Sequence, residues 1–156
     1  MITESITTIG IVTCILTDVN TGIQEIKEYK NIMVTTGKVA ILRRLAGTDL
    51  KTNEGKILYG AIGTDDTAPA ATDTTLGTEI VRKAIASTSY NATLKTCTIR
   101  TFYTTSEANG ALKEFGLFGE DATGSADSGT MFNHANIDIT KTAVKTLTIE
   151  VVISYS

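Results

Sequence analysis

The clearest structural signal in this chain is the alternating run Leu147-Thr-Ile149-Glu-Val151-Val-Ile153-Ser-Tyr155. In an extended strand, successive side chains point to opposite faces, so the apolar residues at odd positions share one face. Mainly polar residues occupy the other face. Such regular alternation is typical of a strand in a sheet that buries one side. The run therefore predicts a strand over residues 144–155.

Shorter runs of the same kind occur through the rest of the chain. Roughly one residue in five is Thr, a β-branched type that suits a half-exposed strand surface. Many short strands separated by turn residues are typical of an antiparallel β-sandwich or barrel-like domain. We expect the second strand to lie at a sheet edge because its pattern is more polar. The strands before the last are predicted over residues 6–17, 23–30, 56–63, 84–90, 93–104, 111–118 and 130–139.

One α-helix is predicted at about residues 36–46. Thr35 or Thr36 supplies an N-cap oxygen, and Gly47 supplies the C-terminal stop. The helix should pack on the sheet through an apolar face formed by Val39, Ile41, Leu42, Leu45 and Ala46. A short helical turn is expected over residues 76–83, although Gly77 disfavours it. Residues 64–75 and 122–129 read as polar loops, the second of them mobile.

Whole-chain numbers predict one globular domain, residues 1–156. The apolar fraction is 42%, the charged fraction 20% and the net charge −3. Interspersed charges without a basic patch argue against nucleic acid as a partner. Neither a signal peptide nor an apolar run of membrane-spanning length is present, so we expect no membrane partner. We expect residues 1–30 to form an N-terminal hairpin or an arm used for inter-subunit contacts.

No residue pattern predicts a catalytic, cofactor-binding or metal site. Cys14 and Cys97 lie far apart in strand-like runs, as buried free thiols or as one disulfide. His134 is the sole histidine, and no nucleophile motif accompanies it; it is expected as a hydrogen-bonded surface or rim residue. The aspartates Asp65, Asp66 and Asp73 lack the spacing of a calcium loop and should cap neighbouring amides.

Several carboxylates leave alternatives open. Glu79 and Arg82 can form an ion pair if their segment is helical. Glu114, in an apolar strand, is either buried and paired or solvent-facing. A hydrolase acting on cell-wall glycan would need two carboxylates across a cleft, with Glu107, Glu114 and Glu120 as the residues to inspect.

An ordered set of short motifs resembles a family of small β-rich structural proteins of tailed bacteriophages. Each motif is short, but their common order is more specific, and together they cover residues 31–156. They are Asn31–Gly37, Ile62-Gly63-Thr64, Leu76–Arg82, Glu107–Gly110, Glu114–Phe118, Gly129–Phe132 and Lys141-Thr142.

This resemblance implies a non-enzymatic virion protein, made in the bacterial host cytoplasm and located in the virion. The family includes capsid decoration (cement) proteins as well as tail, baseplate and fibre-attachment components. The sequence contains no shaft or collagen-like repeat, which favours capsid decoration; the tail, baseplate or fibre-attachment role is the alternative. Expected partners are further copies of the chain, as a dimer or trimer, and the major capsid protein or tail and baseplate proteins. Loops 64–75 and 120–129 and the N-terminal arm are the expected contact regions.

Overall fold

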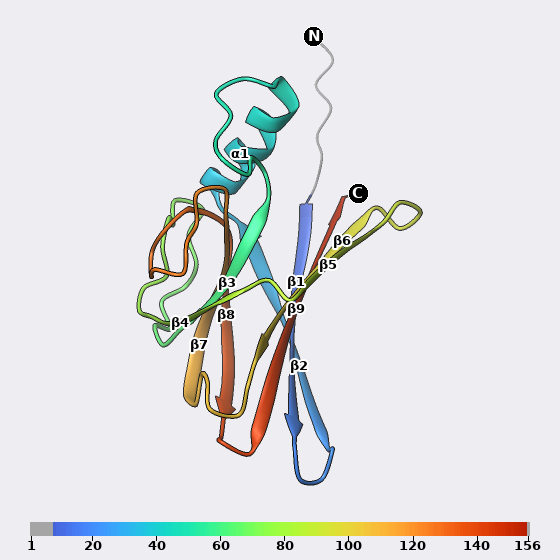
Figure 1. Ribbon diagram of the computed structural model, residues 1–156, viewed down its shortest axis with the longest axis vertical. Coiled ribbons are helices and arrows are strands. Elements are labelled where there is room, and N and C mark those ends of the chain that lie inside the picture. Colours follow the sequence, from blue (N-terminus) through green and yellow to red (C-terminus); the bar gives the residue numbers. More distant parts are fainter. Residues whose placement is uncertain (1–7, 156) are drawn as a thin grey trace.

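The computed structural model describes residues 8–155, in which nine strands and one helix follow one another along the chain (Figure 1). The first two residues of the predicted strand 6–17, and the outer part of the expected arm, lie outside the described residues. The elements are β1 (Thr8–Asp18), β2 (Gln24–Met33), α1 (Thr35–Ala46), β3 (Ile57–Gly63), β4 (Glu79–Ala84), β5 (Ser87–Asn91), β6 (Thr96–Tyr103), β7 (Gly110–Gly119), β8 (Thr130–Lys141) and β9 (Lys145–Tyr155).

The nine strands form one antiparallel sheet in the order β4-β3-β7-β8-β2-β1-β9-β6-β5. Strand β9, which carries the alternating run, pairs along its full length with β1 and along most of it with β6. The sheet curls into a half-barrel, and the predicted class, a mainly β antiparallel domain with one helix, is confirmed. Residues 8–30 form β1 and most of β2, inside this sheet.

The two halves of the sheet meet where β2 joins β8. Only Ile32 and Met33 of β2 pair with β8, and the earlier part of β2 diverges from it. Across the gap, the Tyr29 hydroxyl and the Lys27 ammonium donate to the Asp138 carbonyl oxygen, at 2.8 and 3.2 Å. This narrow junction lets the sheet fold over on itself and enclose a core.

The main core fills the inside of the curl. Its β9 contribution is the odd-numbered face that the alternation predicted: Leu147, Ile149 and Val151 are completely buried. Tyr103 is also buried, and its hydroxyl donates to the Gly60 carbonyl oxygen at 3.0 Å. The other buried members are Val12, Cys14, Leu16, Ala40, Ile62, Ile99, Ala108, Leu112, Phe115, Leu117, Phe132, Ala135, Ile137 and Ile139.

A second, smaller cluster lies on the opposite face of β3, β7 and β8. It consists of Val34, Ala61, Leu76, Phe118, Ala122 and Met131. Irregularities in the ladder between β7 and β8, at Leu112/Glu114 and Leu117/Phe118, change the phase of the alternation. For this reason Leu112 and Phe115 can both face the main core, and Glu114 faces the outer side. The loops that follow β3 and β7 cover this outer cluster.

Helix α1 packs on β8 through small residues, contrary to the predicted apolar face. Gly37 and Ala40 are its buried residues, whereas Val39, Leu42 and Leu45 are 40%, 62% and 78% exposed. Its N-cap is Val34, not a Thr, and the Thr36 hydroxyl instead donates to the Met131 carbonyl oxygen at 2.7 Å. The stop at Gly47 is confirmed, with φ of 65°. In residues 8–155 no helix has the length and apolarity needed to span a membrane.

Two other local expectations were wrong. The predicted helical turn over residues 76–83 is largely strand β4, which pairs with β3. Strand β2 is not a sheet edge, because it lies between β8 and β1. Its polar pattern has a physical reason nonetheless: most of β2 lacks a hydrogen-bonded neighbour on the β8 side.

Both cysteines are free thiols. Cys14 on β1 lies opposite Ile149 of β9, and Cys97 on β6 lies opposite Ile153 of the same strand. Strand β9 therefore separates the two cysteines. Burial raises the pKa of the Cys14 thiol to about 12, which keeps it protonated and unreactive.

We predict that Gly37→Ala destabilises the protein even though Ala favours helices. A Cβ at Gly37 would lie 2.5 Å from the backbone oxygen and 2.6 Å from the Cα of Phe132, so α1 would have to move off β8. We expect a loss of about 2 kcal/mol in the free energy of unfolding, measured by urea denaturation. Gly124→Ala is the control, because nothing lies within 4 Å of its added Cβ. Equal stability of the two variants would contradict this packing.

Candidate functional site

A group of buried polar side chains, including Glu114 and His134, lies over β7 and β8, beneath the loop of residues 64–78. A cleft of about 340 Å³ opens there. It contains three carboxylates and one imidazole, with no Lys or Arg in its lining. The lining residues are Asp65, Thr67, Ala68, Thr72, Asp73, Thr74, Thr75, Leu76, Gly77, Glu114 and His134.

Glu114 occupies the floor of this cleft and is 1% exposed. One carboxylate oxygen accepts hydrogen bonds from the backbone N–H groups of Asp65 and Thr78, at 3.2 and 2.8 Å. The other oxygen accepts the N–H of Gly77 at 2.8 Å. A buried carboxylate is stable only when its charge is compensated by such donors. Of the two alternatives left open by the sequence, Glu114 is therefore the buried and paired one. Its hydrogen bonds hold both ends of loop 64–78 in place.

His134 lies between two carboxylates. Its Nδ1 is 2.7 Å from Asp73 Oδ2, and because a carboxylate only accepts, Nδ1 carries the proton. Its Nε2 lies 3.3 Å from Glu114 Oε2 but makes no hydrogen bond. At 5% exposure, His134 is not the surface or rim residue that the sequence predicted. It was expected to be hydrogen-bonded, and it is.

The cleft has the geometry of a loop anchor more than that of a catalytic centre. The second ring nitrogen of His134 faces a carboxylate, where a hydrolytic triad would place a hydroxyl nucleophile. Asp65 accepts the Thr67 N–H at 2.8 Å and Asp73 accepts the Ala70 N–H at 2.8 Å, so both cap amides as predicted. The Thr67 hydrogen bonds also lower the pKa of Asp65. No metal-binding group of His, Cys, Asp and Glu occurs among the described residues.

A buried ion pair connects β4 to the loop of residues 122–129. Glu79 and Arg82 form an almost fully buried ion pair at 2.7 Å, although the segment is a strand. The register shift at Ile62/Gly63 opposite β4 brings them to the same side. Arg82 lies over the Phe118 ring, 4.2 Å from its centroid, and donates to the Ser128 carbonyl oxygen at 2.7 Å. The loop that was expected to be mobile is therefore hydrogen-bonded to a buried arginine.

Two lysine side chains and a carboxylate hold the turn between β6 and β7 in place. Glu107 accepts from the Lys83 ammonium at 2.7 Å and from the Thr104 backbone N–H at 2.8 Å. Asn109 Oδ1 accepts from the buried Lys141 ammonium at 2.9 Å. Burial lowers the pKa of Lys141, and its hydrogen bonds to this turn satisfy the charge. The motifs Glu107–Gly110 and Lys141-Thr142 therefore meet in space.

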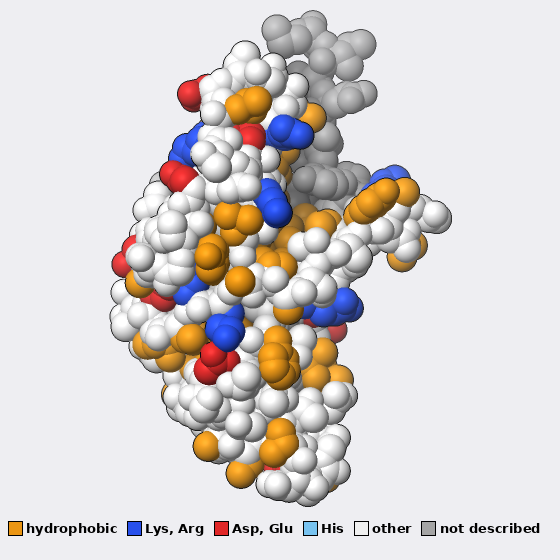
Figure 2. All heavy atoms as spheres, viewed as in Figure 1, with side chains coloured by type: hydrophobic (Ala, Val, Ile, Leu, Met, Phe, Trp, Pro, Cys, Tyr) orange, Lys and Arg blue, Asp and Glu red, His pale blue; other side chains and the backbone are white. Residues whose placement is uncertain are grey.

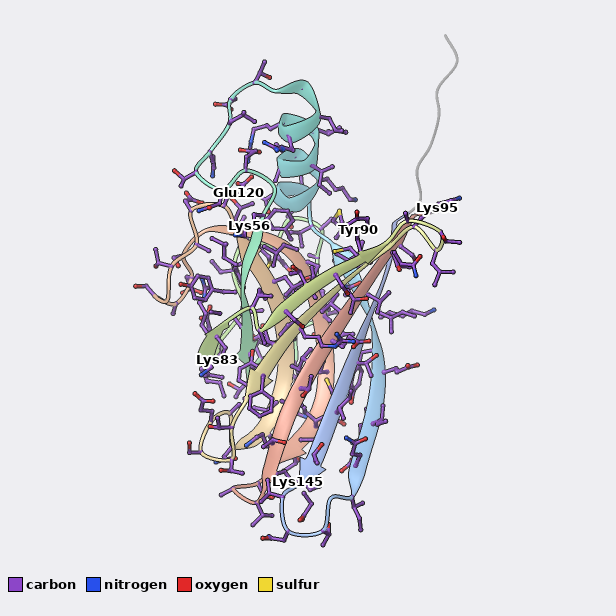
Figure 3. All side chains as sticks on the ribbon, turned by 45° about the vertical axis from the view of Figure 1, so that its right-hand side comes forward. Lys56, Lys83, Tyr90, Lys95, Glu120 and Lys145 are labelled. Carbon is purple, nitrogen blue, oxygen red and sulfur yellow. The ribbon has the colours of Figure 1, made fainter. Side chains whose placement is uncertain are left out.

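A further buried ion pair connects α1 to the end of β7. Arg43 donates to both carboxylate oxygens of Glu120, each at 2.8 Å, and Glu120 is completely buried at the base of the helix (Figure 3). The Thr130 hydroxyl donates to Glu120 Oε2 at 2.6 Å. The Glu120 interaction raises the pKa of Arg43. No sequence pattern predicts this pair, because the two residues are far apart in the chain.

Large apolar side chains are exposed at several places away from the cleft, among them the β1–β2 hairpin with Val19, Ile23 and Ile26. On α1 and the segment after it they are Val39, Leu42, Leu45 and Leu50. At the β5–β6 hairpin, Tyr90 is 83% and Leu94 67% exposed. Figure 2 shows apolar side chains both over the helix and at this projecting hairpin, interrupted by charged ones. Such positions are typical of protein contact surfaces.

We predict that Glu114→Gln destabilises the fold by about 3 kcal/mol. Gln keeps the shape but turns an NH₂ group against backbone N–H donors, leaving at least one of them unpaired in the interior. Urea denaturation measures the change. The exposed residue Glu28, in β2, supplies the control variant Glu28→Gln, which should be neutral. If Glu114→Gln matched that control, the assigned role of Glu114 in holding the loop would be wrong.

We also predict that Glu107 makes stability depend on pH. The Lys83 ammonium and the Thr104 amide lower the pKa of Glu107 in the fold from 4.5 to about 2. The unfolded chain then takes up the proton first, so the stabilisation is present above about pH 5 and lost toward pH 2. The difference in unfolding free energy between wild type and Glu107→Gln should shrink over this window. A difference that stayed constant with pH would contradict the prediction.

The comparisons with known proteins give no identification. No family model, no curated protein and no solved structure matches this chain. Its function is therefore argued from the geometry above and from the resemblance in its sequence.

Proposed function

We propose that this chain is a non-enzymatic structural protein of a tailed-bacteriophage virion, and that it binds the assembled head lattice as a capsid decoration protein. What carries the proposal is the position of the motif residues in the fold. Glu114, Arg82 and Asn109 come from three of the motifs, and each holds a loop or turn in place. The motifs thus describe a scaffold, and a resemblance in scaffold is what a structural family would share.

The state of the carboxylates supports a non-enzymatic role. A glycan hydrolase needs two carboxyl groups free to exchange protons across one cleft. The three candidate carboxylates instead take part in three separate sets of interactions. Glu107 pairs with Lys83, Glu114 with loop amides and Glu120 with Arg43. None of the three is left unpaired for proton transfer.

The loops expected to contact other virion proteins are well suited to that task. Loop 64–78 and loop 122–129 are each fixed by a buried ionic residue, Glu114 and Arg82. Fixed loops lose little conformational entropy on binding, which leaves more of the contact energy for affinity. On a symmetric lattice, many weak contacts of this kind add through multivalency. The exposed apolar residues of α1 provide further area for binding the major capsid protein.

The copy number of this protein in purified virions tests the proposal. Quantitative mass spectrometry should find it in a near-stoichiometric ratio to the major capsid protein, because a decoration protein covers the head lattice. The major tail protein of the same particles serves as the internal standard. A few copies per particle would replace head decoration by a tail, baseplate or fibre-attachment role. Absence from the virion would refute the proposal.

A further inference from the structure

The sheet has several strand edges without a hydrogen-bonded neighbour in residues 8–155. Strands β4 and β5 are its two ends, and β2 and β8 have open stretches where they diverge. An open edge presents unpaired N–H and C=O groups that another strand can bind, and charged residues usually guard such edges. Three of the four carry charged side chains that are at least partly exposed: Lys83 on β4, Glu25, Lys27, Glu28 and Lys30 on β2, and Asp138 on β8.

Strand β5 is the exception. Its sequence, Ser87-Thr-Ser89-Tyr-Asn91, contains no charged residue and no proline, and all five residues are exposed. It pairs on one side with β6 and, within residues 8–155, has no hydrogen-bonded strand on the other. The β5–β6 hairpin extends away from the body of the molecule, so the free side of β5 is accessible (Figure 1; Tyr90 and Lys95 in Figure 3). This edge lacks the features that prevent strand addition.

We propose that β5 pairs antiparallel with β5 of a second copy of this chain, forming a two-fold symmetric dimer through a continuous sheet. A strand edge specifies its occupant, because its alternating donors and acceptors match only another strand. The second copy is the partner because β5 is self-complementary. When all five residues overlap, Ser89 lies opposite Ser89 of the partner copy, Thr88 opposite Tyr90, and Ser87 opposite Asn91.

The cross-strand pairs in this register are favourable. Thr88 and Tyr90 lie opposite Ile99 and Cys97 of β6, residues of or packed against the main core, so both side chains are on the inner face of the sheet. Each exposed Tyr90 ring would therefore pack on a β-branched Thr88 of the partner copy, a stabilising kind of pair. No like charges meet. Each chain has one β5, so the assembly closes at two copies.

The dimer adds to the proposed function the interface through which copies self-associate, and it rests on that proposal only for its biological setting. The two fail separately. Virion copy number decides the function, whereas the mass of the purified chain in solution decides the dimer. Multi-angle light scattering on the full chain should give twice 16.6 kDa.

The decisive variants place charges on the two-fold axis. Ser89→Lys sets two ammonium groups directly opposite each other, and Ser89→Asp sets two carboxylates opposite each other, so each variant should be monomeric. An equimolar mixture of the two should recover the dimer, because Lys then meets Asp. Thr93→Lys, in the turn of the same hairpin, adds the same charge outside β5 and should remain dimeric.

Every outcome decides the proposal. A monomeric wild-type chain, or an assembly of three or more copies, would overturn it. Dimers that persist in both Ser89 variants would place the interface elsewhere and also overturn it. Two monomeric variants whose mixture stays monomeric would show that residue 89 does not face its own copy. Recovery of the dimer in the mixture alone establishes both the pairing and its register, and shows that each variant is folded.

Discussion

The buried carboxylate of Glu114 is the constraint on which the outer half of this structure depends. A charge in a protein interior must be compensated, and Glu114 receives three backbone N–H groups from the two ends of loop 64–78. The loop in turn carries Leu76 into the outer apolar cluster, and Asp73 to His134. A loop this long without regular structure is usually mobile or functional. Here a single side chain, projecting outward from β7 because of a shift in register, gives the loop a fixed conformation.

The same principle recurs at three other places on the sheet. Arg82 holds loop 122–129, Asn109 and Lys141 hold the β6–β7 turn, and Arg43 with Glu120 holds α1. Ion pairs of this kind contribute little net stability once desolvation is counted, yet removing one partner is costly. Their main effect is therefore on which conformation forms. The main core makes the sheet stable, and the buried ionic residues determine where the loops, the turn and the helix lie on it.

The sequence was informative where structure follows from local pattern. The alternation in β9 and the stop at Gly47 depend on near neighbours, and both occur as expected. Expectations from the sequence were wrong where the structure depends on contacts between residues that are far apart in the chain. The apolar side of α1 looked like its packing face, but close approach to Phe132 selects Gly37 and Ala40. Likewise His134 looked solvated because nothing nearby in sequence shows Asp73 above it. Glu114 was noticed, but its three donors come from residues that only the fold brings together.

The placement of these constraints bears on how the protein can meet other chains. Loops fixed on one side of the sheet present a preformed polar surface, whereas α1 and the β5–β6 hairpin expose apolar or uncharged groups without partners in residues 8–155. Exposing Tyr90 and Leu45 to water has a solvation cost, and burying them between chains would remove it. The exposed charged residues on β2, and the half-exposed Lys83 on β4, disfavour strand addition at those edges. Apolar or uncharged surfaces that favour association thus occur beside charged strand edges that disfavour it. This arrangement limits the geometries in which copies can assemble.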